Sequence, residues 1–216
     1  MRFTKRNCLG AFSKPYPINE NLRVPTDHLG CVYYFKGTSG SGKSTIPFQM
    51  LISDPKRYEM IDANGKVVAT VSPTYSIASL GKYHAGAKCG GCDTLPDFQY
   101  MADALKLLVD VLPPFYDIIF EGILASTIYE KWVDRILNIS DRQLKILYLE
   151  ISKEEAIKRV LARSGNTESE KLEQLVIEKH KRIVSHIERY PEVPVLTINT
   201  ELVKIEDMVS TFHNLR

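Results

Sequence analysis

The sequence has few cysteines and no long apolar run, and both shortages restrict what this protein can be. Four cysteines in 216 residues are too few for the disulfide framework of a secreted domain. No stretch approaches the ~20 apolar residues that a membrane-spanning helix needs. The N-terminal sequence MRFTKRNCLGAF also lacks the apolar centre of a signal peptide. We therefore expect a soluble, cytoplasmic protein with no membrane partner.

An excess of charge of one sign is also missing. The chain carries 28 Lys and Arg against 26 Asp and Glu, for a net charge of +2 and a pI near 8.2. This balance gives no support of its own to nucleic-acid binding, although it leaves room for a local basic groove. The length fits one α/β domain.

The clearest motif is GTSGSGKST at Gly37–Thr45, which matches the phosphate-binding loop pattern G-x-x-x-x-G-K-[ST]. A buried strand over 31–35 leads into the loop and a helix follows it, as the pattern requires. Backbone N–H groups of such a loop surround phosphate oxygens, while Lys43 reaches the β- and γ-phosphates and Ser44 ligates Mg²⁺. We expect ATP to bind through Gly37, Thr38, Ser39, Gly40, Ser41, Gly42, Lys43, Ser44 and Thr45.

Strand and helix patterns alternate along the rest of the chain. This order predicts an α/β fold with a central, mostly parallel sheet of about five strands and helices on both faces. The expected strands cover 31–35, 116–122, 144–151 and 193–198. The expected helices cover residues up to 53 after the loop, then 96–112, 127–138, 153–163, 168–190 and 202–215.

The segments outside this alternation suggest a domain plan. Residues 1–30 are predicted to form an extended N-terminal arm, whose basic residues are either solvated or in contact with nucleic acid. A single domain should occupy 31–216, with a β-hairpin inserted at 57–71 because Asn64-Gly65 favours a tight turn. Residues 72–94 show no strand or helix periodicity and are predicted to form a substrate-binding loop.

Glu121 stands at the carboxyl end of the expected strand over 116–122. Open α/β sheets place their ligands at this edge. Two roles follow for Glu121: it holds Mg²⁺, directly or through water, or it accepts a proton from an attacking hydroxyl group. The alternative is a structural contact with a helix N-terminus.

Arg159 and Arg163 lie four residues apart on one helix face, next to a polar segment. This pattern is typical of a lid, predicted here over 158–170, whose arginines close over a triphosphate and stabilise the charge on the transferred group. The alternative is a solvated helix in which Glu154 or Glu155 pairs with an arginine one turn later.

The segment that ends at Asp93 is the candidate acceptor site. Asp93 follows Gly90-Gly91 and is either a general base or ligand of the substrate hydroxyl, or the cap of a turn. Lys82 and Tyr83 are predicted to bind substrate together with Gly90 and Gly91. Tyr75 and Tyr83 are either stacking platforms for a base or half-buried core residues.

Cys89 and Cys92 form a C-x-x-C pair with His84 nearby. A structural zinc site needs four ligands, and no second paired motif supplies the rest. A backbone anion-binding turn around the two glycines explains the pattern equally well.

With these residues in place, residues 31–216 resemble the P-loop kinase superfamily, which includes nucleoside and nucleotide kinases. The phosphate loop, IIFEG, EEAIKRVLAR and a terminal strand with INT follow in the expected order. This resemblance implies a three-layer fold and ATP-dependent transfer of a phosphoryl group to an alcohol.

A narrower resemblance rests on VATVSPTYSIASLGKYHAGAKCGGCDTL followed by FEGIL. These segments are similar to those of phage-encoded 5-hydroxymethyluracil DNA kinases, which phosphorylate the hydroxymethyl group of a modified base in DNA. The resemblance implies that ATP and Mg²⁺ bind at Lys43 and Ser44, that Asp93 and Glu121 act on the acceptor side, and that the protein works in the host cytoplasm.

Three functions remain open at this point. The acceptor is hydroxymethyluracil in DNA, or it is a free nucleoside, nucleotide or other small metabolite. A third possibility is an ATP-dependent switch or binding module, which has no phosphoryl acceptor. The absence of an N-K-x-D sequence and of an L-S-G-G-Q-like run argues against a GTPase switch and a transporter ATPase.

Overall fold

The structure is a computed structural model of the chain. It describes residues 3–7, 29–84, 90–122, 129–139, 141–164 and 170–215. Most of the predicted N-terminal arm, Cys89 and the middle of the predicted lid lie outside these ranges.

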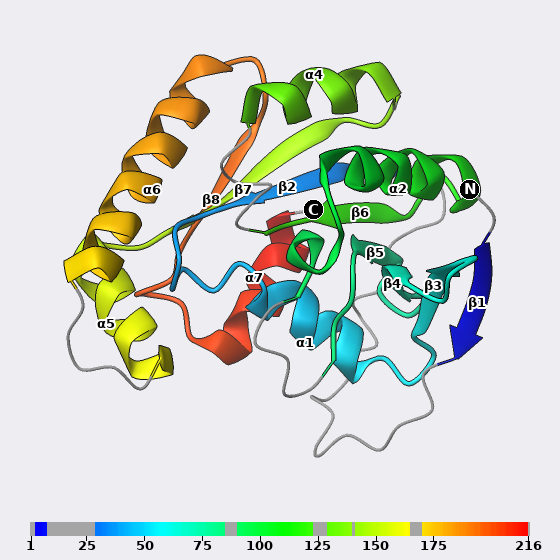
Figure 1. The fold of residues 1–216 in the computed structure, drawn as a ribbon, viewed down its shortest axis with the longest axis horizontal. Helices are drawn as coiled ribbons and strands as arrows, with labels where there is room; N and C mark the ends of the chain where they lie inside the picture. The colour runs from blue at the N-terminus through cyan, green and yellow to red at the C-terminus, as the bar shows by residue number, and fades with distance from the viewer. Residues whose placement is uncertain are drawn as a thin grey trace.

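Within the described residues, eight strands form one sheet in the order β1-β3-β4-β5-β6-β2-β7-β8 (Figure 1). The strands are β1 (Phe3–Asn7), β2 (Val32–Lys36), β3 (Tyr58–Asp62), β4 (Val67–Ser72), β5 (Ile77–Leu80), β6 (Asp117–Phe120), β7 (Leu144–Glu150) and β8 (Val195–Asn199). In sheet order, the strands β5, β6, β2, β7 and β8 pair in parallel with their neighbours. The strands β1, β3, β4 and β5 pair antiparallel. The predicted α/β class and parallel central part are confirmed, and the eight strands slightly exceed the expected five or so plus a hairpin.

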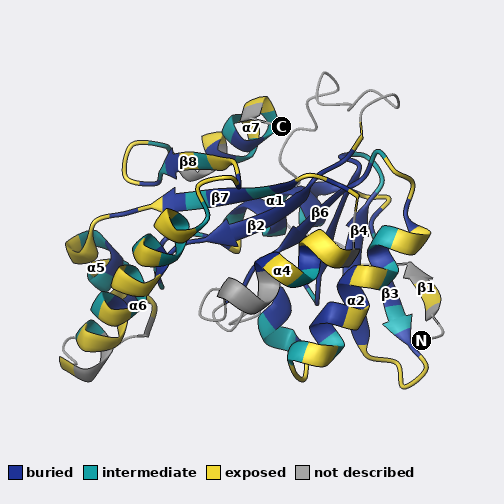
Figure 2. Ribbon diagram, turned by 90° about the horizontal axis from the view of Figure 1, so that it is seen from above, coloured by how far each residue is buried: buried dark blue, intermediate teal, exposed yellow. Residues whose placement is uncertain are grey.

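Helices cover both faces of the sheet (Figures 1 and 2). The α-helices of the described part are α1 (Thr45–Ser53), α2 (Phe98–Val111), α4 (Tyr129–Ile139), α5 (Lys153–Ser164), α6 (Glu170–Arg189) and α7 (Ile205–Leu215). A short 3₁₀ turn, η2, spans Cys92–Thr94. Helices α2 and α4 lie on one face and α1 and α7 on the other, which gives the three layers that the superfamily resemblance implies.

The central strand β2 shows why the sheet is covered on both sides. Its side chains alternate between two buried clusters, with Tyr34 packed toward α2 and α4 and Tyr33 and Phe35 packed toward α1 and α7. A strand buried on both faces reads as a continuous apolar run, as this one does in the sequence. The layers therefore fix β2 and the loop that follows it in the middle of the molecule.

The strand β5 was missed, and its segment was wrongly predicted to be loop. It contains the small residues Ala78 and Ser79, which have weak strand preferences. Strand β5 forms because it pairs on both sides, antiparallel with β4 and parallel with β6. The predicted hairpin, formed by β3 and β4, is confirmed, and β5 makes it continuous with the parallel sheet.

The helix that follows the phosphate-binding loop tolerates its proline. Pro47 is the third residue of α1, where a backbone N–H has no partner within the helix. Helix α1 runs unbroken to Ser53, so the proline does not interrupt it. Across the described part of the chain, no helix combines the length and hydropathy needed to cross a membrane.

Candidate active site

The phosphate-binding loop connects the end of β2 with the start of α1 and is held from the side by two later helices. Gly40 adopts a φ of +87°, and a Cβ at this position would lie 2.7 Å from the carbonyl oxygen of Ala156 on α5. Thr38 Oγ1 donates a hydrogen bond of 3.2 Å to the carbonyl oxygen of Val176 on α6. The loop is therefore fixed in position by contacts that the motif alone does not reveal.

Lys43 lies over this loop and is buried. Its ammonium donates a 3.0 Å hydrogen bond to the carbonyl oxygen of Thr38, which folds the side chain back across the loop. Burial lowers the pKa of Lys43 to about 8, although the nearby carboxylates of Glu121 and Asp93 raise it. A bound polyphosphate would act in the same direction as these carboxylates, so the site favours an anionic ligand.

Glu121 follows β6 immediately and is almost fully buried, with an exposed fraction of 1%. Both carboxylate oxygens are hydrogen-bonded, since Ser44 Oγ donates to Oε2 over 2.9 Å and Tyr83 Oη donates to Oε1 over 2.8 Å. Burial raises the pKa of Glu121 to about 7, while Lys43 and the two hydrogen bonds act against that rise. The sheet register explains the placement, because Phe120 pairs with Tyr34 and so leaves Glu121 beside the phosphate-binding loop.

The segment that carries Asp93 packs against Glu121 and is hydrogen-bonded to its main chain. The backbone N–H of Cys92 donates to the carbonyl oxygen of Glu121 over 2.8 Å. Gly91 has a φ of +63°, and any side chain there would overlap with Glu121 Oε1. Thr94 Oγ1 accepts from the N–H of Lys82 and donates to the carbonyl oxygen of Gly91, which closes the segment on itself.

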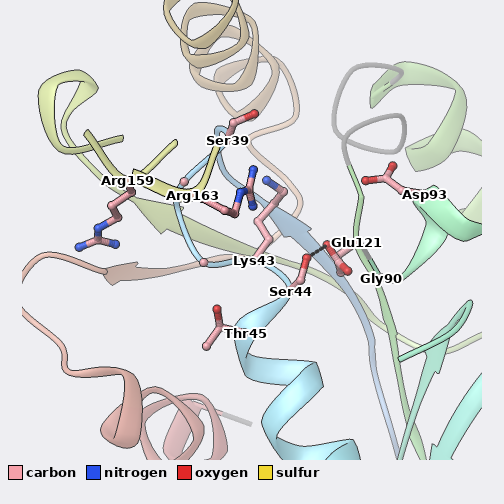
Figure 3. A pocket seen from close by; sticks show the side chains of 11 residues that line it. Ser39, Lys43, Ser44, Thr45, Gly90, Asp93, Glu121, Arg159 and Arg163 are labelled. Atoms are coloured by element: carbon pink, nitrogen blue, oxygen red, sulfur yellow. Dashed lines mark hydrogen bonds between the residues drawn. The ribbon is translucent and has the colours of Figure 1, made fainter. Parts of the chain in front are cut away.

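These parts enclose one pocket of about 250 Å³. Figure 3 shows Lys43 and Ser44 near the centre, Glu121 directly beside Ser44, and Asp93 on the far side of Glu121 from Lys43. The lining consists of Ser39, Gly40, Gly42, Lys43, Ser44, Thr45, Gly90, Asp93, Glu121, Arg159 and Arg163. The structure thus brings together the sequence-predicted loop, both candidate carboxylates and both arginines.

The two arginines differ in what they contact. The Arg163 side chain points toward Lys43 in Figure 3, and its charge contributes to the lowered pKa of that lysine. Arg159 donates to Glu155 Oε1 over 2.9 Å and to the carbonyl oxygen of Thr200 over 3.0 Å. Arg159 therefore has the pairing that we considered as the alternative to a lid, while it still borders the pocket.

Several predicted site residues do not line the pocket. Gly37, Thr38 and Ser41 are buried within the loop structure, and Lys82 pairs with Gly91 in an isolated bridge. Tyr75 and Tyr83 are 3% and 4% exposed in one core cluster, so they are more deeply buried than the core alternative supposed, and this burial argues against stacking on a base. The contact of Tyr83 with Glu121 was missed, because the two residues are 38 positions apart.

A buried lysine beside the loop was also missed. Lys36 ends β2, is 0% exposed, and places its ammonium 4.2 Å from the centre of the Tyr34 ring. Burial and the neighbouring charge of Lys43 lower the pKa of Lys36 to about 6. A lysine at the end of an apolar run, directly before a phosphate-binding loop, was the signal in the sequence.

The oxygen atoms at the base of the pocket suit a hard divalent cation. Ser44 Oγ and Glu121 Oε2 lie within 2.9 Å of each other, and Mg²⁺ prefers hydroxyl, carboxylate and water oxygens. The residues present therefore fit Mg²⁺.

The zinc site considered for the cysteine pair is a separate question. In the described residues, no group of three or more His, Cys, Asp or Glu side chains could hold a metal ion, and Cys92 and Cys31 belong to different core clusters. The zinc interpretation gains no support there, and Cys89 lies outside those residues.

Comparisons with known proteins agree on one family. A family model described as 5-hmdU DNA kinase matches residues 11–210. The chain is 36% identical over 189 residues to 5-hmdU DNA kinase 1 of Salmonella phage ViI, covering 86% of this chain and 84% of the relative. It is also 38% identical over 107 residues to the 5-hmdU DNA kinase of Bacillus phage SP10, covering 50% of this chain and 16% of that longer protein.

A solved structure of deoxyadenosine kinase from M. mycoides is 15% identical, with a TM-score of 0.42 over 85% of this chain and 97% of that one. The extent of the family match and the identity to the Salmonella phage relative lead to one conclusion: this chain belongs to the 5-hmdU DNA kinase family.

Proposed function

We propose that this protein transfers the γ-phosphate of ATP to the hydroxymethyl group of 5-hydroxymethyluracil in phage DNA. The observation that carries the proposal is the convergence of Lys43, the Ser44–Glu121 pair and Asp93 on one pocket. A kinase needs a phosphate-binding cation, a place for a metal ion and a base for the acceptor, and these residues supply all three.

The donor half of the reaction belongs to the phosphate-binding loop. Its N–H groups and Lys43 bind the triphosphate, and Lys43 stabilises the charge that develops on the leaving oxygens. Arg163 adds a second cation at the pocket edge. Mg²⁺ held at Ser44 and Glu121 would neutralise phosphate charge when bound.

Asp93 is the better candidate for the general base. Glu121 is 1% exposed and uses both oxygens in hydrogen bonds to Ser44 and Tyr83. Asp93 is partly exposed and lines the pocket on the side opposite the phosphate-binding loop. An acceptor hydroxyl between Asp93 and the γ-phosphate would give up its proton to Asp93 as its oxygen attacks phosphorus.

The DNA substrate is inferred from the family. A hydroxymethyl group on a base inside a duplex cannot reach an enclosed pocket, so the base must leave the stack or come from a single strand.

The test is phosphate transfer from γ-labelled ATP to four acceptors. These are hydroxymethyluracil-containing duplex DNA, the same duplex with thymine, the matching single strand, and free 5-hydroxymethyldeoxyuridine. Label on the hydroxymethyluracil DNA alone is the expected result. Label on the free nucleoside alone would refute the DNA assignment, and release of free phosphate with every acceptor would indicate a switch or binding module.

A further inference from the structure

A buried hydrogen-bonded chain runs from the pocket into the core and ends on a residue that the proposed chemistry does not use. Ser44 Oγ contacts Glu121 Oε2, Tyr83 Oη contacts Glu121 Oε1 over 2.8 Å, and Ser79 Oγ contacts Tyr83 Oη over 3.0 Å. Tyr83 is 4% exposed and Ser79 is 0% exposed. Such a chain in a protein interior fixes the orientation of each group in it.

The direction of each hydrogen bond follows from the chemistry of the groups. The Tyr83 phenol donates to Glu121 Oε1, which is the direction required when the carboxylate is ionised, as it is when it binds a cation. The phenol oxygen then accepts from the Ser79 hydroxyl. The hydrogen bond from Ser79 fixes the orientation of the Tyr83 hydroxyl, and the hydrogen bond from Tyr83 holds Oε1 of Glu121 toward the core.

Backbone packing prevents the carboxylate from turning away. A side chain at Gly91 would overlap with Glu121 Oε1, which shows how closely the backbone approaches this oxygen. The Cys92 N–H also holds the Glu121 main chain over 2.8 Å. Because Oε1 is enclosed in this way, Oε2 remains beside Ser44 at the pocket wall.

We infer that Tyr83 is a positioning residue that orients Glu121 for divalent-cation binding together with Ser44. The inference rests on the proposed function, since it assigns a role within the same site. Groups that orient a metal ligand typically contribute about 10- to 100-fold in metal affinity or activity. The role differs from the substrate-stacking role that the sequence suggested for the same tyrosine.

The position of Tyr83 also links the cation site to the acceptor side. Its neighbour Lys82 forms the bridge with Gly91, and Thr94 contacts both of these residues. The segment that places Asp93 therefore also places the phenol on Glu121.

The test measures cation binding without any acceptor. Mn²⁺ is titrated into the protein with a non-hydrolysable ATP analogue, and free Mn²⁺ is followed by electron paramagnetic resonance. Tyr83→Phe is expected to weaken Mn²⁺ binding about 10-fold. In catalytic assays, the half-saturating Mg²⁺ concentration should rise by the same factor, with kcat largely restored at saturating Mg²⁺.

The matched control is Tyr75→Phe. Tyr75 is equally buried, in the same core cluster, but its hydroxyl contacts Ser53 at 3.4 Å instead of the site. It should leave Mn²⁺ affinity unchanged. In a Glu121→Gln background, Tyr83→Phe should have almost no further effect, since the group that it orients has been replaced.

Unchanged Mn²⁺ affinity in folded Tyr83→Phe, or an equal loss in Tyr75→Phe, would overturn the inference. If Tyr83→Phe does not fold, Ser79→Ala replaces it, with an expected loss of about 3-fold, and no loss would again refute the role. Mn²⁺ binding does not depend on the acceptor, so failure of the wild type to phosphorylate hydroxymethyluracil DNA would refute only the proposed function.

Discussion

The phosphate-binding loop and the segment that ends at Asp93 border the same pocket but are stabilised differently. Within the phosphate-binding loop the internal contacts are short-range, as when Lys43 donates to the carbonyl oxygen of Thr38 five positions away, and the long-range contact of Thr38 with Val176 attaches the finished loop to α6. The Asp93 segment depends on distant partners, as in the contact between Tyr83 and Glu121.

This difference reflects what each side has to recognise. Phosphate oxygens accept hydrogen bonds from any correctly directed N–H group, so a short glycine-rich sequence can specify the donor side. Recognition of one particular hydroxyl group needs side chains from several parts of the chain at fixed positions. The following predictions test this division, beginning with the largest expected effect.

The Lys43→Ala change should remove the main cation that stabilises the transferred phosphate on the ATP side of the pocket. Because Lys43 stabilises charge that develops during transfer, kcat is expected to fall at least about 1,000-fold. Steady-state transfer from γ-labelled ATP measures the effect, and circular dichroism checks that the variant is folded. A rate near that of the wild type would refute the assignment of the loop.

The Asp93→Asn change should affect only the acceptor side. Loss of a general base typically lowers the rate about 100-fold or more, while the Kd for ATP should stay the same. Measuring transfer and ATP binding on the same preparation separates the two sides. An equal loss in Glu121→Gln with retained cation binding would instead make Glu121 the base.

The Glu121→Gln change should weaken transfer and should also make the stability of the fold less sensitive to alkaline pH. The folded pKa of about 7 exceeds the ordinary value of 4.5. The carboxyl group therefore stabilises the folded state fully below about pH 4.5, and this contribution is lost as the pH rises through 7. Because glutamine stays neutral, the variant should lose less stability than the wild type as the pH rises through 7.

Thermal unfolding at pH 5 and pH 8, without ATP or divalent ions, measures this effect. The difference in Tm between Glu121→Gln and the wild type should be larger at pH 8. A difference that does not change with pH would contradict the buried-charge explanation. Glutamine retains a hydrogen-bonding amide, so the comparison changes the charge more than the packing.

The two arginines provide the smallest and most selective comparison. Arg163→Ala should lower kcat about 10-fold, because its side chain points toward Lys43 in the pocket. Arg159→Ala should mainly lower stability, by about 1 kcal/mol, because its hydrogen bonds go to Glu155 and Thr200. Kinetics and chemical denaturation of both variants distinguish the two roles, and the reverse pattern would contradict them.

The sequence predicted the parts of the fold that depend on local pattern. The buried strand before Gly37 and the hairpin at Asn64-Gly65 were both recognisable in the sequence. Each of these signals lies within a few residues of the structure that it specifies.

The missed features depend on partners far away in the chain. Strand β5 contains the weak strand formers Ala78 and Ser79, and it exists because β4 and β6 pair with it. The Tyr83 side chain was assigned to substrate because aromatic residues near an active site can stack on bases. Its true partner, Glu121, becomes a neighbour only through the pairing of β5 with β6 and the bridge at Lys82.

The buried Cys92 makes opening of the acceptor segment measurable. This thiol is 0% exposed, lies next to Asp93, and has its pKa raised well above the ordinary value by burial. Such a thiol is protonated and inaccessible to alkylating reagents while η2 stays closed. The rate at which a peptide carrying Cys92 gains mass in iodoacetamide therefore reports how often the segment exposes its interior, and a bound acceptor that holds it shut will slow that labelling.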